Sequence, residues 1–472
     1  MYKCFGKHFI IPVTTAIFMV YMICSAVAQE GNTSTLTLEG SIDAAMENNL
    51  SIKTAEEKVE TARHKVKEAL GAMFPSLSAN ASYTYFGKLP TMAFDLDPSA
   101  LGIPPEMLEM MGQGAAQEGS EPNEIPMGEE DTYSTGLTLQ QPLFMWGKLI
   151  NNYKQTKYSL EAAEYELEAT KDQVILDVIT SFYGVLLTEH MVDTAEMAVK
   201  QVEAHLKTAQ DLVDAGMATN FDLLRAKVQL ANTKSGLIKA RNGLNLSKDG
   251  LKNMLGINLN EPIEVEGQLV YVPLKLDLPQ HLAKAMENRP EIKQLEMQAN
   301  AGEKFVSLAK ATNRPNLVAV GNYNWESNAD TPGDIFDGDE WKNSWNITLS
   351  LNFPIFDGFS ARAKVKQAES GLRQIQLGME QLKDGIGLEV RAAYFGVMEA
   401  EELLKAQEET VQQAEESLRI ANLQYKNGII TSVELMDTEL AFTQAQTNRF
   451  NALHDYAIAV AKLEKATASE LD

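Results

Sequence analysis

Two carboxylates near the C-terminus have the type and spacing that could do chemistry. Glu434 and Asp437 lie about one helical turn apart, so their side chains share a face of a helix. Several such pairs around one axis would attract cations, and a divalent cation could bridge them. A structural interpretation stands beside this one. Thr431 and Glu434 fit a Thr-x-x-Glu capping box, and a first helical turn favours a carboxylate.

Catalytic motifs have no support in the sequence. The six histidines are scattered, and there is no His-x-x-x-His pair, glycine-rich phosphate loop or nucleophile motif. We therefore expect a protein that is not an enzyme and uses no cofactor and no bound metal. Methionines gather in the stretch 89–131, and thioethers can bind soft copper, but without Cys or His nearby an exposed loop is the favoured interpretation. These methionines are Met92, Met107, Met110, Met111 and Met127.

The charge balance excludes one class of partner. With 41 Lys and Arg against 65 Asp and Glu, the net charge is −24, which repels a phosphate backbone and argues against nucleic acid. An ordinary acidic surface explains the same charge. After residue 28 there is no uninterrupted apolar run of the roughly 18 residues that a membrane helix needs, so a membrane-embedded part is expected to be a β-barrel.

Residues 1–28 have the pattern of a secretory signal peptide. Lys3 and Lys7 precede an apolar stretch over 10–23, and small residues at 26–28 form a cleavage site. An uncleaved membrane anchor is the alternative. Cys4 and Cys24 both lie in this segment, so the mature chain is expected to have no disulfide. A lipid-anchored Cys24 stays open, although bulky Ile23 precedes it where a lipoprotein signal has a small residue.

A seven-residue repeat of apolar residues organises the chain. Such a repeat is typical of a helix packed along a coiled-coil seam, and small residues at the second seam position allow a close approach of the partner. The seam occurs twice, 212 residues apart. Its large positions are Val178, Val185, Val192, Val199, Leu206 and Val213, and then Val390, Val397, Leu404, Val411, Leu418 and Tyr425.

Other segments recur as well, so the whole chain is predicted to be a tandem repeat. Residues 45–48 match 285–288 at an offset of 240, whereas 142–144 match 354–356 at an offset of 212. The 28 extra residues of the first copy fall in 89–131, which is rich in Pro, Gly, Met and acid and is therefore expected to form a long exposed loop.

Each copy is expected to follow one plan, in which a helix and two strands lead into a very long helix and a returning helix. The first copy, 29–256, has its helix over 41–73, strands over 76–87 and 132–141, the long helix over 148–214 and the return over 220–255. The second copy, 279–472, has the same elements over 279–312, 316–325, 341–353, 360–426 and 432–467, after a linker over 257–278. Each long helix would extend about 100 Å.

The four predicted strands alternate between apolar and polar residues and carry aromatic residues near their ends. This pattern matches transmembrane β-strands, although a soluble hairpin packed on helices gives it too. About eight strands is the smallest number that closes a barrel, so four strands in lipid require several chains. The expected membrane-interface aromatics are Tyr83, Tyr85, Tyr133, Tyr323, Trp325, Trp341 and Trp345.

Two tandem hairpins that open into very long helices resemble the TolC-like outer-membrane efflux family. The local motifs are Gln141-Pro142-Leu143-Phe144 with Gly147, Pro354-Ile355-Phe356-Asp357-Gly358-Phe359, and the turns over 215–224 and 427–437. The resemblance implies a mainly α chain with transmembrane β, located in the bacterial outer membrane with a long periplasmic helical part. It further implies that three chains share one twelve-stranded barrel in outer-membrane lipid, and that a periplasmic adaptor protein and an inner-membrane transporter are partners.

The resemblance also assigns roles at the periplasmic end of the helices. Tyr425, three residues before the turn glycine Gly428, and the carboxylates Glu434 and Asp437 are expected to form the pore aperture. The family's best-known member has an arginine two residues after this glycine, within its closed-state hydrogen-bond network. Ile430 stands there in this sequence, so that part of the network is expected to be missing.

The first copy differs at the corresponding positions. Asp222 keeps the acid of Glu434, but Arg225 reverses the charge of Asp437, so we expect the second copy to line the pore and the first to lie outside it. The turns themselves are expected to contact the adaptor through Gly216, Thr219, Asp222, Gly428 and Thr431.

The sequence is compatible with two classes of function. The first is an outer-membrane conduit for small molecules such as drugs or metals, or alternatively for proteins in type I secretion. The second is a periplasmic coiled-coil scaffold whose strands never enter lipid. No motif in the sequence identifies the cargo.

Overall fold

The computed structural model describes residues 34–89, 91–93, 124–126, 130–327 and 341–469. The expected signal peptide, both cysteines and most of the methionine-rich stretch lie outside these residues. Contacts divide the chain into two compact units. Unit one is Met1–Glu56, Glu166–Pro290 and Leu382–Asp472, and unit two is Glu57–Tyr165 and Glu291–Gln381. Each unit takes segments from both of the expected sequence copies.

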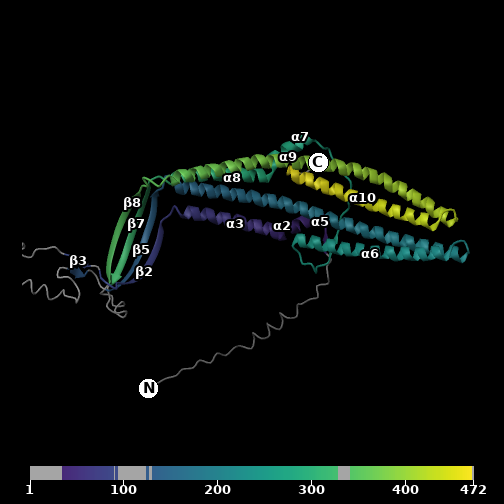
Figure 1. Ribbon diagram of the computed structural model, residues 1–472, viewed down its shortest axis with the longest axis horizontal. Coiled ribbons are helices and arrows are strands. Elements are labelled where there is room, and N and C mark those ends of the chain that lie inside the picture. The colour runs from purple at the N-terminus through teal and green to yellow at the C-terminus, as the bar shows by residue number, and fades with distance from the viewer. Residues whose placement is uncertain (1–33, 90, 94–123, 127–129, 328–340, 470–472) are drawn as a thin grey trace, which may run out of the picture. The chain divides into compact units, whose positions relative to one another are not determined.

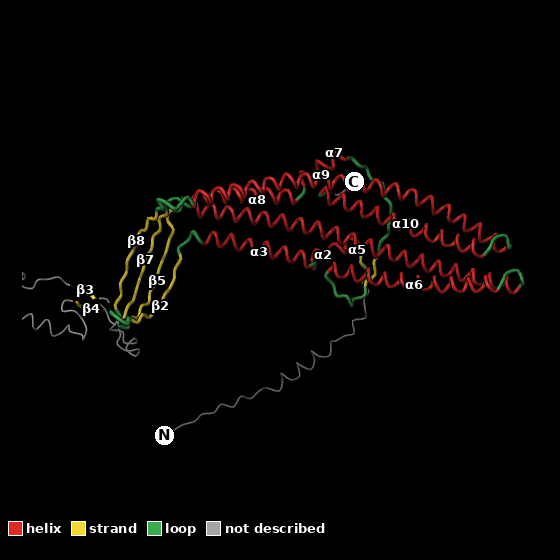
Figure 2. Tube along the Cα trace, in the orientation of Figure 1, coloured by secondary structure: helices red, strands yellow, loops and turns green. Residues whose placement is uncertain are grey.

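Unit two contains a four-stranded antiparallel sheet (Figure 2). Its strands are β2 (Ser76–Tyr85), β5 (Asp131–Phe144), β7 (Asn316–Ser327) and β8 (Lys342–Asn352), in the order β2-β5-β7-β8. β5 continues past the predicted end at 141, because a register shift between Pro142 and Phe144 lets it keep pairing with β7 beyond a proline. Two short strands, β3 (Thr91–Ala93) and β4 (Glu124–Pro126), pair within the stretch predicted to be only loop.

The register of this sheet separates apolar from polar residues. Leu77, Leu139, Gly321 and Ile347 lie side by side in one cross-strand row, and the next row on that face contains Trp345. The other face carries Ser, Thr and Asn, which bond to one another across the strands. Thr138 donates to the Asn322 side chain at 3.0 Å, and Asn322 donates to Asn346 at 3.0 Å. The predicted alternation is therefore a property of the whole sheet.

Unit one contains two helical hairpins (Figure 1). The first helical hairpin joins α5 (Lys148–Asp214) to α6 (Asn220–Leu255), and the second joins α9 (Ser360–Lys426) to α10 (Ser432–Thr467). The first parts of α5 and α9 belong to unit two. The heptad positions Val178, Val185, Val390 and Val397 are at most 1% exposed, as expected for a packed seam.

Two helices that were predicted to be continuous are each broken, which corrects the ranges 41–73 and 279–312. The structure has α2 (Leu38–Asn48) and α3 (Leu50–Gly71), and then α7 (Leu278–Asn288) and α8 (Pro290–Ala311). Asn49 is extended, and its side chain accepts from the Ser51 backbone N–H at 2.8 Å, so it caps α3. Arg289 precedes Pro290, which disfavours helical geometry at the residue before it.

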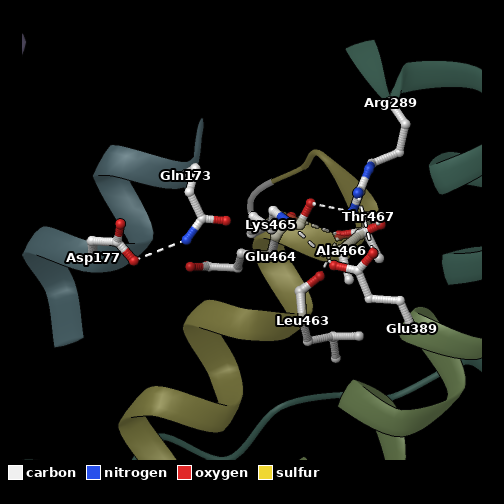
Figure 3. Close-up of polar contacts among 9 residues, drawn as sticks. All are labelled: Gln173, Asp177, Arg289, Glu389, Leu463, Glu464, Lys465, Ala466 and Thr467. Carbon is white, nitrogen blue, oxygen red and sulfur yellow. Dashed lines mark hydrogen bonds and ion pairs between the residues drawn. The ribbon is translucent and has the colours of Figure 1, made fainter. Parts of the chain in front are cut away.

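Both breaks anchor a returning helix at repeat-equivalent positions. Asn49 donates its amide to the Met254 carbonyl at 2.8 Å, whereas buried Arg289 donates to the Ala466 carbonyl at 3.4 Å (Figure 3). Arg289 and Lys465 also hold the Glu389 carboxylate at 3.1 and 3.2 Å. Burial alone would raise the pKa of Glu389, but the two cations outweigh it and lower this pKa. The anchor at Arg289 is thus ionic, and the anchor at Asn49 is neutral.

The segment between the two copies forms contacts that the sequence pattern did not predict. Its short strand β6 (Ile263–Val265) pairs in parallel with β1 (Ser34–Leu36). Further along, Tyr271 donates to Glu401 at 2.7 Å, and Tyr456 donates to the backbone carbonyl of Val272. This segment therefore ties α9 and α10 together near the C-terminus of α10.

Among the described residues, one helix meets the length and composition criteria of a membrane span, by a measure that tolerates charged residues within the window. An 18-residue window of α5 has a mean hydropathy of 1.3, and 28% of it is buried. Packed helices meet the same criteria. Val174, Val178, Val185 and Leu186 of α5 belong to a core cluster with α2 and α6 residues, so we assign α5 to the packed core.

Candidate gate at the helix turns

Glycines in the left-handed conformation form both helical turns. Gly216 has φ +74° and Gly428 has φ +72°, which a side chain would strain. The amide after each glycine bonds back to the preceding helix, Met217 to the Leu212 carbonyl at 2.8 Å and Ile429 to the Gln424 carbonyl at 2.9 Å. The two turns therefore have the same geometry, as the internal repeat predicts.

Both returning helices begin with a capping box. Thr219 and Asp222 bond reciprocally at the start of α6, and Thr431 and Glu434 do so at the start of α10. The Thr219 hydroxyl lowers the pKa of Asp222, and the Thr431 backbone amide lowers the pKa of Glu434. The structural interpretation of Glu434 is therefore correct, and both carboxylates are held in their ionised form.

The two expected gate carboxylates share an exposed face of α10. Glu434 and Asp437 are both exposed, one helical turn apart, and only Glu434 is engaged in the cap. In the first copy, Arg225 occupies the position of Asp437, and its guanidinium lies 5.9 Å above the Phe221 ring. The second turn thus presents two acidic side chains where the first presents one acid and one base.

Tyr425 lies away from this exposed face. Its side chain is 5% exposed and packs with Leu418, Ala421 and Leu435 inside the second helical hairpin. Burial raises the pKa of Tyr425, an effect that the Ser432 hydroxyl opposes and that the carboxylates of Asp222 and Glu439 reinforce. The structure therefore brings Glu434 and Asp437 together and places Tyr425 behind them.

A buried polar cluster lies next to Tyr425, and sequence reasoning missed it. The His205 ring packs edge-on against Tyr425 with centroids 5.1 Å apart, and its Nε2 atom lies 3.2 Å from the Ser432 hydroxyl. Its Nδ1 atom lies 3.6 Å from the Glu439 carboxylate. His205 comes from α5 and the other members come from the second hairpin, more than 200 residues away. In the sequence, the only sign of this buried cluster is a histidine next to the seam position Leu206.

The expected turn contacts are accessible. Gly216, Thr219, Gly428 and Thr431 are exposed, and Asp222 is half-buried in its cap. Large apolar side chains at the same turns are also exposed, and they are Met217, Phe221 and Ile429. A partner that docks on these turns would therefore meet apolar as well as polar surface.

The expected aromatic residues gather toward one end of the sheet. The Tyr83 and Tyr133 rings lie 4.9 Å apart, and the Tyr323 and Trp325 rings lie 4.4 Å apart. Trp345 pairs directly with Tyr323 across the strands. Tyr85 is exposed at the end of β2, and Trp341 immediately precedes β8. These residues form a band at the ends of the strands farthest from the helices.

A second aromatic group, which the sequence analysis did not assign, lies where strands give way to helices. Phe144 packs edge-on against Trp146 at 5.1 Å, and Phe356 packs edge-on against Phe359 at 5.6 Å. Trp146 and Phe359 both adopt positive φ beside a glycine, and the Arg314 guanidinium lies 5.7 Å above the Trp146 ring. Phe144, Phe356 and Phe359 belong to the sequence motifs that carry the family resemblance, and Trp146 lies beside the first of them.

Comparison with known proteins places this architecture in one family. The family model described as "Outer membrane efflux protein" matches residues 41–257 and 281–469. The probable outer membrane lipoprotein SilC of Salmonella typhimurium is 23% identical over 414 residues, 86% of this chain and 80% of that protein. The probable efflux pump outer membrane protein TtgC of Pseudomonas putida is 22% identical over 350 residues, 70% and 67% of the two chains.

A solved structure shows the same fold. The outer membrane channel CmeC of Campylobacter jejuni matches with a TM-score of 0.73 at 17% identity, over 95% of this chain and 91% of that chain. A mainly helical chain with very long helices and a four-stranded antiparallel sheet thus has the architecture of TolC-type channels, as the sequence resemblance predicted.

The chain belongs to the outer membrane efflux protein family. It is a subunit of an efflux channel of the bacterial outer membrane, with an extended helical part in the periplasm, and it is not an enzyme. The conduit interpretation of the sequence is therefore confirmed, and the scaffold interpretation is set aside.

Proposed function

We propose that three copies of this chain pool their sheets into one twelve-stranded barrel that exports small molecules. The supporting observation is the sheet itself. Within the described part of the chain its outer strands β2 and β8 pair on only one side, and every residue of both strands is exposed. An open sheet edge in lipid would leave backbone groups unpaired at several kcal/mol each, so the edges need neighbouring strands.

The two faces of the sheet fit this arrangement. The apolar face would contact outer-membrane lipid, and the face with the Asn and Thr network would line an aqueous interior, as in other barrels with a channel. The aromatic bands at the two ends of the strands fit the two interfaces of the bilayer.

The helical hairpins would continue the channel, with the gate at their turns. Glu434 and Asp437 of three chains would surround one axis with six carboxylates, which attract cations and repel one another. In this proposal Tyr425 supports the aperture from behind, and the first copy, with Arg225 in place of an acid, lies outside the pore. The exposed turns would dock a periplasmic adaptor that connects the channel to an inner-membrane transporter.

Small molecules are the proposed cargo rather than proteins. The relative TtgC is named as the outer membrane protein of an efflux pump, and no feature of the described residues favours protein secretion over efflux. Metal ions are included in the proposed small-molecule cargo, since an acidic aperture is compatible with cations.

Charge neutralisation in planar bilayers tests the gate. The double variant Glu434→Gln/Asp437→Asn should raise the closed-channel conductance by roughly two-fold or more and weaken its cation selectivity. Glutamine still completes a capping box, so the turn should keep its structure. The matched control Asp222→Asn, in the first copy, should change neither property. Unchanged conductance and selectivity in the double variant would refute the gate.

A further inference from the structure

The buried cluster around His205 joins the two helical hairpins. His205 lies on α5, Tyr425 lies near the end of α9, and Ser432 and Glu439 lie in the first part of α10. All four residues are at most 5% exposed. The contact is therefore a point where the second hairpin is fastened to the first, just behind the proposed gate carboxylates.

The polar groups of this cluster have few partners other than each other. Nε2 of His205 meets the Ser432 hydroxyl at 3.2 Å, and Nδ1 lies within ion-pair distance of Glu439, at 3.6 Å. Among the residues that the structure describes, neither carboxylate oxygen of Glu439 has a hydrogen-bond partner. A buried carboxylate in this position depends on the imidazole for compensation, because a lone buried charge is costly.

We propose that the His205–Glu439 pair fastens the second helical hairpin to α5 and sets how readily the gate opens. This inference rests on the proposed gate at Glu434 and Asp437. Those two residues begin α10, and Glu439 follows them on the same helix. Movement of α10 away from α5 would carry the gate carboxylates with it, and it would separate the two members of the pair.

The distance between the two hairpins reports directly on the attachment. Cysteines at the exposed positions Lys207 on α5 and Leu440 on α10 would carry spin labels in the full-length channel. Both native cysteines lie in the expected signal peptide. In the wild-type background, the population with a short label distance should dominate, because the pair holds α10 against α5.

A double-mutant cycle separates ionic attachment from simple packing. His205→Leu alone leaves Glu439 buried without its partner, so it should raise the long-distance population at neutral pH. His205→Leu/Glu439→Leu removes both polar groups and should restore the short distance. If the cluster only filled space, the double variant would open at least as much as the single variant, and that result would overturn the proposal.

Conductance of the same preparations separates this inference from the proposed function. Wild-type channels that conduct and respond to Glu434→Gln/Asp437→Asn, but not to His205→Leu, would refute the attachment alone. A chain that forms no conducting pore would refute the proposed channel itself. His205→Leu/Glu439→Gln gives a further check, since it removes the buried charge and should restore part of the short-distance population that His205→Leu loses. A His205→Leu/Glu439→Gln variant that opens as far as His205→Leu alone would also overturn the proposal.

Discussion

The two helical hairpins have identical lengths but are held together differently. α5 and α9 each span 67 residues, and α6 and α10 each span 36. In the first hairpin, three glutamates spaced by seven residues meet three cations on α6. The pairs are Glu189–Lys248 at 3.0 Å, Glu196–Arg241 at 2.7 Å and Glu203–Lys234 at 2.8 Å.

The second hairpin keeps the glutamates but not the cations. Glu401, Glu408 and Glu415 occupy the equivalent positions on α9, while α10 has Leu453 and Val460 where α6 has Arg241 and Lys248, and Gln446 replaces Lys234. Apolar burial, rather than charge pairing, stabilises the second hairpin. α10 packs its apolar residues against neighbouring helices, whereas α6 leaves many of its apolar residues exposed. The exposed α6 residues include Phe221, Leu224, Val228, Ile238 and Leu246.

The two hairpins therefore share one backbone plan but differ in the interactions that stabilise them and in the surface that each exposes. The first hairpin is closed by surface charge pairs and presents an apolar face outward. In the second hairpin α10 is packed against its neighbours, and the turn presents the exposed carboxylates Glu434 and Asp437. We infer that the second hairpin forms the functional interior and that the first needs a neighbour to cover α6, as the proposed trimer would provide.

The largest expected effect comes from removing a buried anchor of the second hairpin. Tyr456→Ala deletes a ring that is 3% exposed and the bond to the Val272 carbonyl, so it should cost about 3–5 kcal/mol. The equivalent change in the first hairpin, Leu244→Ala, affects a partly buried side chain and should cost less, about 1–2 kcal/mol. Thermal unfolding of the two variants measures this; equal losses would contradict the comparison.

A smaller effect is expected from removing the charge pairs of the first hairpin. Lys234→Ala/Arg241→Ala/Lys248→Ala should destabilise α6 only modestly and speed the exchange of its amides by roughly several-fold, because exposed ion pairs are weak. Hydrogen exchange of α6 amides would show the loss at low salt and a much smaller one at high salt. As a control, Gln446→Ala in the second hairpin should show no salt dependence.

The smallest expected effect is a pH dependence of stability, which should distinguish the anchor at Glu389 from the anchor at Asn49. The folded-state pKa of Glu389 is lowered, so its contribution is present above the unfolded pKa and is lost as the pH falls through the folded value. Because Glu389 is 40% exposed, we expect about 1 kcal/mol, lost below roughly pH 4.

A neutral control exists at the other anchor. Asn49→Ala removes an amide that does not titrate, so its cost should be the same at neutral and acidic pH. Unfolding of Glu389→Gln and wild type across this range measures the difference. A gap between them that is unchanged down to pH 3 would show that the carboxylate is not the stabilising group.

The sequence predicted the fold well where periodicity was long. Heptad spacing placed Val178 and Val390 in buried seams, and strict alternation placed the apolar face of the sheet. The breaks at Asn49 and Arg289 were missed because helical periodicity continues across them, and β1 and β6 were missed because three residues carry too little pattern.

The site was less predictable for a different reason. Glu434 and Asp437 are local to one turn, so their shared face follows from spacing alone. The environment of Tyr425 depends on His205, which is distant in sequence, and only the packed structure shows that this tyrosine is buried.

The mass of the intact channel in detergent is the most direct test of whether neighbouring chains complete this fold. Native mass spectrometry of a preparation that conducts in bilayers should show three copies of the chain, and truncation of the edge strand β8 should abolish both the trimer and the conductance. A conducting preparation in which every particle has the mass of a single chain would contradict it.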